Sequence, residues 1–81
     1  MPRPKILSGK DVISILAKYR FAIHTQKGSH IKLRRMNANQ EKETLTIPDH
    51  KKLDRGTTRA ILNQASKYID LETLKEDFME E

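Results

Sequence analysis

Residues 21–34, which read FAIHTQKGSHIKLR, decide the fold of this chain. Apolar and polar side chains alternate on both sides of Gly28, and this two-residue period is typical of strands with one buried face. Gly28 can adopt a positive φ without a steric penalty, so Lys27-Gly28-Ser29 supplies turn residues. The stretch therefore predicts two strands joined by a short turn.

A third strand is expected after a polar loop at residues 37–42. Leu45 and Ile47 alternate with threonines, and Pro48 ends the strand. Three consecutive strands with short connections predict an antiparallel meander with one apolar and one polar face. The alternation assigns Phe21, Ile23, Thr25, Ile31 and Leu33 to the apolar face. The solvent-exposed face would carry His24, Gln26, His30, Lys32, Arg34, Thr44 and Thr46.

An amphipathic helix is expected before the strands, from about Gly9 to Tyr19. Ser8 is typical of a helix N-cap, and Asp11 stands where a capping-box carboxylate bonds back to the cap. The apolar spacing places Val12, Ile13, Leu16 and Ala17 on one helical face.

Two further helices are expected after the strands. Thr57 is the expected N-cap of the first, and Asp70 of the second, shorter one. The first would carry Ala60, Ile61, Ala65 and Tyr68, with Leu62 nearby, and the second Leu71, Leu74 and Phe78.

This order of elements predicts an α+β fold of two layers, a three-stranded antiparallel sheet covered on one face by two helices. A chain of 81 residues supports a single domain over residues 1–81. We expect residues 1–7 to form an extended basic arm and residues 70–81 an acidic helical tail. Without cysteine, a signal peptide or an apolar run of ~20 residues, we expect no disulfide, no membrane partner and a cytoplasmic location.

The charge of the chain is concentrated in its first part. Residues 1–59 hold fourteen Lys and Arg against five Asp and Glu, a sum of +9, whereas residues 60–81 hold two against six, a sum of −4. A strongly basic segment favours polyanions, above all nucleic acid, as partners. The alternative is that the lysines only keep a small domain soluble.

His30 is the most informative candidate for chemistry. It follows the glycine turn on the solvent-exposed face, with Lys32 and Arg34 two and four residues further along that face. Imidazole exchanges protons near neutral pH, and the cations would attract a phosphate. Alternatively, His30 is only a polar residue on the solvated side of a strand.

The other candidate chemistries have less support. His24 and His50 show no spacing typical of a zinc site, so we expect neither a metal nor a small-molecule cofactor. Ser29 is not expected to be a nucleophile activated by His30, because adjacent strand residues point to opposite faces.

A second basic cluster surrounds the start of the second helix. Its members are Lys51, Lys52, Arg55 and Arg59, and phosphate contacts with the amides of Gly56 and Thr57 are expected there, unless the segment is only a solvated turn. With only two Phe and two Tyr, a platform for base stacking is not indicated. Recognition would then rest on backbone charge and shape, as in binders of double-stranded RNA.

Several segments together resemble the HicA, or YcfA-like, toxin family. They are residues 6–13, 26–30, 47–50, 53–57 and 59–65. The resemblance runs in order over residues 6–66 and implies a fold like that of double-stranded-RNA-binding domains. Two positions depart from the family pattern: Arg20 replaces a glycine or small residue, and Lys67-Tyr68 replaces a glycine.

The resemblance implies an RNA-cleaving toxin, an mRNA interferase that uses no metal, neutralised by direct binding of a HicB-like antitoxin. The essential histidine of the family follows its Gly-Ser turn, which is His30 here. Expected contacts with RNA come from Lys27, Gly28, Ser29, Lys32, Arg34, Lys51, Lys52, Arg55 and Arg59. The alternative is a non-catalytic RNA- or DNA-binding module of the same fold.

Overall fold

The computed structural model describes residues 2–80. Its elements, in chain order, are β1 (Arg3–Pro4), α1 (Gly9–Ala17), β2 (Ala22–Lys27), β3 (His30–Met36), β4 (Lys42–Pro48), α2 (Arg55–Ala65), α3 (Leu71–Phe78) and β5 (Met79–Glu80). Met1 and Glu81, the outermost residues of the predicted arm and tail, lie outside the described residues.

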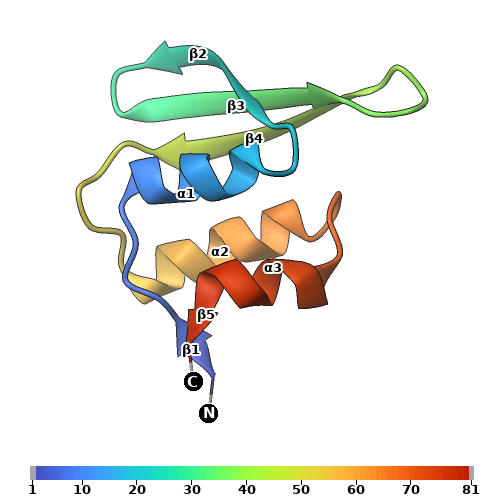
Figure 1. The fold of residues 1–81 in the computed structure, drawn as a ribbon. Helices are drawn as coiled ribbons and strands as arrows, with labels where there is room; N and C mark the ends of the chain where they lie inside the picture. The colour runs from blue at the N-terminus through green and yellow to red at the C-terminus, as the bar shows by residue number, and fades with distance from the viewer. Residues whose placement is uncertain (1, 81) are drawn as a thin grey trace.

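The main sheet is antiparallel, with strand order β2-β3-β4. Helices α1 and α2 lie on one side of it, and α3 packs beside α2 (Figure 1). The α+β class, the three-stranded antiparallel sheet and its coverage by helices on one face are therefore confirmed.

The core lies between the sheet and the helices. Leu33, Leu45 and Ile47 from the sheet are almost fully buried, as are Val12 and Leu16 from α1. From the second half of the chain, Leu53, Ile61, Leu62, Ala65, Leu74 and Phe78 complete the same cluster. The helix predicted as a tail thus contributes Leu74 and Phe78 to the core, and the burial of such side chains stabilises the fold by roughly 1.5–3 kcal/mol each.

The predicted basic arm is extended, and it pairs with the end of the chain. Arg3 lies opposite Glu80 and Pro4 opposite Met79 in a two-stranded antiparallel sheet. From the start of α2, the Arg55 guanidinium donates to the Pro4 carbonyl, with a distance of 2.9 Å between Nε and the oxygen. Strands β1 and β5 lie at the opposite end of the molecule from β2 (Figure 1).

The caps of the helices confirm two sequence predictions and correct a third. Ser8 and Asp11 form the predicted capping box, and Asp70 caps α3. The cap of α2 is Asp54 and not Thr57, whose backbone N–H donates to the Asp54 carboxylate at 2.7 Å. The helix begins earlier because the carboxylate three residues before Thr57 accepts that bond, as an N-cap does.

Some predicted core positions are exposed instead. Ala17, Ala60, Tyr68 and Leu71 are exposed, while Ile15 packs against the core. Helix α1 ends at Ala17 rather than Tyr19, because the chain turns through Arg20, which has a φ of 71°.

A β-bulge in β2 corrects the predicted faces of that strand. Ile23 lies opposite Leu33, but Thr25 lies opposite Lys32, so His24 is an extra residue in the ladder. Beyond it the alternation is inverted: Thr25 shares the face of Lys32, and Gln26, opposite Ile31, shares the core face. Strand β2 is also exposed along its whole length, and Ile23 is 57% exposed rather than buried.

No helix within residues 2–80 combines the length and the apolar character needed to cross a membrane.

Candidate nucleic-acid interface

The side of the main sheet that faces away from the helices is bare, and we call it the open face. Strand pairing assigns to it Ala22, Thr25, Lys27, His30, Lys32, Arg34, Met36, Lys42, Thr44, Thr46 and Pro48. These paired residues include four Lys or Arg and one His but no Asp or Glu. An anionic ligand would therefore meet only attractive charges across the face.

His30 occupies one end of the open face, at the first position of β3. Lys27 lies opposite it on β2 and Pro48 on β4, while Lys32 follows on the same face of β3. The His30 side chain is exposed, and within residues 2–80 it forms no hydrogen bond. Its imidazole is thus accessible to a bound molecule.

The turn before His30 is fixed by three backbone and side-chain features. Gly28 has a φ of 58°, in the left-handed region that favours glycine. The Gln26 amide donates to the Gly28 carbonyl at 3.2 Å, and the Asp49 backbone N–H donates to the Ser29 carbonyl at 2.7 Å. The turn and the end of β4 therefore hold His30 in place from both sides.

Two further cations continue the open face away from His30. Arg34 lies between Ala22 and Thr44, half-buried, and its Nε atom has no acceptor within the described residues. Lys42 lies opposite Met36 at the far end. Lys42 was not among the residues predicted for the site, although the alternation of β4, extended two residues back from Thr44, indicates it.

The members of the second predicted cluster lie on different elements. Lys51 and Lys52 are exposed in the loop after β4, and Arg59 is exposed on α2. Arg55 instead joins the two ends of the chain, since it bonds to Pro4 and to the Glu80 carboxylate.

The start of α2 already holds an anion of its own. The Asp54 carboxylate accepts from the backbone of Thr57 and Gly56, and these bonds lower the pKa of Asp54. Because a carboxylate occupies the amides to which a phosphate was assigned, the predicted phosphate contacts at Gly56 and Thr57 are not retained.

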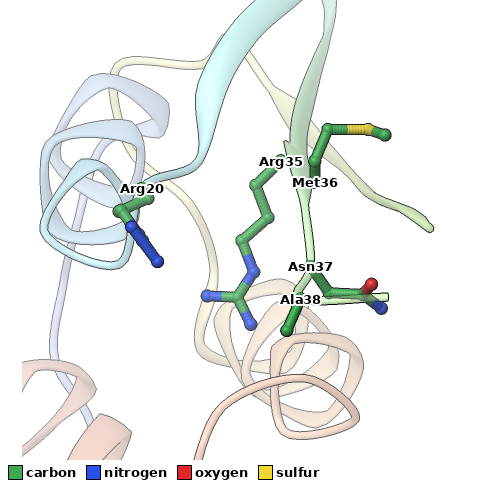
Figure 2. Close-up of a pocket in the computed structure, with 5 residues that line it drawn as sticks. All are labelled: Arg20, Arg35, Met36, Asn37 and Ala38. Atoms are coloured by element: carbon green, nitrogen blue, oxygen red, sulfur yellow. The ribbon is translucent and has the colours of Figure 1, made fainter. Parts of the chain in front are cut away.

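A hollow of about 280 Å³ at the other end of β3 is structural. It is lined by Arg20, Arg35, Met36, Asn37 and Ala38 (Figure 2). The Arg35 guanidinium is committed there: it donates to the Glu43 carboxylate and to the Tyr19 and Tyr68 carbonyls at 2.8 and 2.9 Å. It also stacks over the Phe21 ring at 4.8 Å, so Arg35 closes that end of the core, and all three of its nitrogen atoms already donate to groups of the protein itself.

The three histidines stand apart in the fold. His30 begins β3, His24 lies in the bulge of β2, and His50 lies in the loop after β4. Within residues 2–80, no three His, Asp or Glu side chains gather in the way that a metal ion requires.

The fold and this face define a class of protein: a small α+β domain with a bare, positively charged sheet face around one histidine. Residues 9–66 match the family model described as the HicA toxin of bacterial toxin–antitoxin systems. The chain belongs to this family. It is accordingly a toxin of a toxin–antitoxin system, and the family implies a cognate antitoxin as its partner. The chain shows no significant match to a curated protein or to a solved structure.

Proposed function

We propose that the chain cleaves RNA, with His30 as the proton-transfer group. The observation that supports this most strongly is the open face itself, where an exposed imidazole lies between Lys27 and Lys32 and no carboxylate is paired into the face. Family membership gives the toxin class, and the positive charge of the face supports a polyanion as the substrate.

The proposed reaction is an internal transfer at one phosphodiester. The ribose 2′-oxygen loses its proton, attacks the phosphorus, and the bond from phosphorus to the 5′-oxygen breaks as that oxygen gains a proton. His30 serves as the base for the 2′-hydroxyl or as the acid for the 5′-oxygen. The products are a 2′,3′-cyclic phosphate and a free 5′-hydroxyl, which together contain all the atoms of the substrate.

Lys32 and Arg34 would stabilise the charge that develops on the phosphorane. Both lie on the same face of β3 as His30, and Arg34 has an Nε donor without an acceptor. Positioned cations of this kind stabilise a transition state without a metal ion. Lys27, Gly28 and Ser29 in the turn, with Lys51 and Lys52 in the loop after β4, are proposed to bind the flanking RNA backbone.

The antitoxin would inhibit by covering the open face. A partner that hides His30 and its neighbouring cations excludes RNA from the same surface. In the complex, His30 should therefore be protected from modification by diethyl pyrocarbonate; a complex that leaves it reactive contradicts this proposal.

The test compares the protein with His30→Ala on a defined single-stranded RNA, with and without EDTA, followed by analysis of fragment ends. We expect cleavage that survives EDTA, yields 2′,3′-cyclic ends and falls by 10²–10⁴-fold, roughly the contribution of one proton-transfer residue, in the variant. His24→Ala is the matched control, since His24 is an exposed histidine of the same sheet.

Circular dichroism would verify that both variants fold. Undiminished cleavage by a folded His30→Ala protein would refute the role of His30. Salt-dependent binding without cleavage by any of the proteins would instead favour the non-catalytic nucleic-acid-binding module.

A further inference from the structure

We propose that a hollow between the start of α1 and the loop after β4 is a phosphate subsite, which holds the RNA phosphate next to the one at His30. The hollow measures about 380 Å³ and is lined by Ser8, Lys10, Asp49, His50 and Lys51. This inference rests on the proposed function, and it assigns roles to Lys10 and His50 that the sequence did not suggest.

The charges around the hollow favour an anion. Lys10 and Lys51 come from two different segments, and the His50 imidazole adds a further hydrogen-bonding group. The single carboxylate of the lining, on Asp49, lies 3.4 Å from the Gln26 amide. The nearby Asp11 carboxylate accepts from the Ser8 backbone at 2.9 Å as part of the helix cap.

Ser8 retains a hydrogen-bond donor on the same hollow. Its hydroxyl oxygen accepts from the Asp11 backbone N–H at 2.9 Å, which leaves the hydroxyl hydrogen free. A hydroxyl, two ammonium groups and an imidazole form a donor set suited to the oxygens of a phosphodiester.

The walls of the hollow are fixed relative to His30. Pro48 lies directly opposite His30, and the Asp49 backbone N–H donates to the Ser29 carbonyl at 2.7 Å. His50 is thus two residues along the chain from the cross-strand partner of His30. Two residues of extended chain span roughly 7 Å. The hollow therefore adjoins the end of the sheet that carries His30, on the side of α1, and a bound RNA strand that passes around this end would place its neighbouring phosphate there.

The start of α1 is clamped against the same loop. The Gly9 backbone N–H donates to the His50 carbonyl at 2.9 Å. A side chain at Gly9 has no room, because its Cβ would lie 2.1 Å from the Pro48 carbonyl oxygen. Lys10 and His50 are thus held together before any ligand binds, which reduces the entropic cost of binding.

The test pairs a change in the protein with a change in the substrate. Each phosphate next to the scissile one is replaced in turn by an uncharged methylphosphonate, and kcat/KM is measured for the wild type, Lys10→Gln and His50→Gln. Lys67→Gln is the matched control. Lys67 is an exposed lysine after α2, and its neighbour Tyr68 is bonded to Arg35, near the end of β3 that lies away from His30. Binding is measured in parallel on RNA with a 2′-deoxy sugar at the cleavage site, which cannot react.

We expect one methylphosphonate position at which the wild type and Lys67→Gln lose about 10-fold, while Lys10→Gln and His50→Gln, which have already lost one contact to that phosphate, lose clearly less. Such non-additivity is the signature of a direct contact. Lys10→Gln should also reduce the slope of log Kd against log salt by about one.

Losses that multiply at every position would overturn the subsite and leave the proposed cleavage intact. If the wild type cleaves no RNA, the Kd values are compared in the same way. Non-additive effects of the side-chain and phosphate substitutions on Kd would support the subsite without catalysis, and additive effects would refute the subsite. Variants that lose affinity only for the antitoxin would also overturn it, and would assign the hollow to a protein partner.

Discussion

Arg20 has a backbone conformation that is unfavourable for a residue with a side chain. Its φ of 71° lies in the left-handed region, where a side chain is disfavoured. This conformation explains why glycine, which has no Cβ, would suit the position. The other departure from the family pattern, Lys67-Tyr68, has no positive φ, so the end of α2 needs no glycine in this chain.

Replacing Arg20 by glycine should therefore stabilise the protein. Relief of the left-handed conformation contributes about 1–2 kcal/mol, and the greater freedom of glycine in the unfolded chain offsets about 0.5–1 kcal/mol. We expect a net gain of roughly 0.5–1 kcal/mol in the free energy of urea unfolding.

The control for this substitution is Ala17→Gly, an exposed helical position with ordinary backbone angles, which should lose about 1 kcal/mol. A stability of Arg20→Gly below that of the wild type would contradict the assignment of strain to this residue.

At the scale of the elements, the sequence predicted the strands and helices well and the details of β2 poorly. A two-residue period carries the information for β3 and β4, whose alternation is uninterrupted. The bulge at His24 depends on how β2 pairs with β3, and nothing in the alternation of residues 21–27 indicates it. Similarly, Asp54 and Thr57 are both good caps, and only the path of the loop decides between them.

Helix α3 is joined to α1 by a small polar cluster. The Asp77 carboxylate accepts from the Lys18 ammonium at 2.7 Å and from the Tyr19 hydroxyl at 3.0 Å. The bond from Lys18, opposed in part by burial, lowers the pKa of Asp77 below the usual range of an aspartate. These bonds link two helices that are more than fifty residues apart in the chain.

This cluster predicts a loss of stability in acid. Because the pKa of Asp77 is lower in the folded state than in the unfolded state, its contribution is complete above about pH 4 and is lost as the pH falls through the folded value. Asp77→Asn should lower the unfolding free energy at pH 7 by about 1 kcal/mol and should flatten its dependence on pH below 4. Urea titrations from pH 2.5 to 7 measure both; an unchanged slope would show that other carboxylates dominate.

At the scale of the molecule, the proposed reactive residue and the arginine that closes the core lie at opposite ends of β3. His30 and its turn lie at one end of the open face, while Arg35 closes the core at the other end of β3. The sequence could predict His30, Lys32 and Arg34 as a row because one strand carries all three. It could not predict the hollow at Lys10 and His50, since these residues are brought together by a chain reversal of some forty residues.

The C-terminal segment lies beyond the family match at residues 9–66 yet belongs to the same core. Phe78→Ala should therefore cost about 3–5 kcal/mol of stability, as expected for a fully buried aromatic ring. Thermal unfolding followed by circular dichroism would test this, with the exposed Leu71→Ala as the control. A Phe78→Ala protein as stable as the control would mean that residues 67–80 form a dispensable appendage.

The bulge in β2 has a further consequence, for solubility. All six residues of this outer strand are exposed, so its free backbone groups offer a template on which another strand could grow. The extra residue at His24 breaks the even spacing that such growth requires, and Lys27 places a charge at the end of the strand. The same irregularity that defeats the simple alternation thus protects a sheet with one bare face from aggregating through its edge.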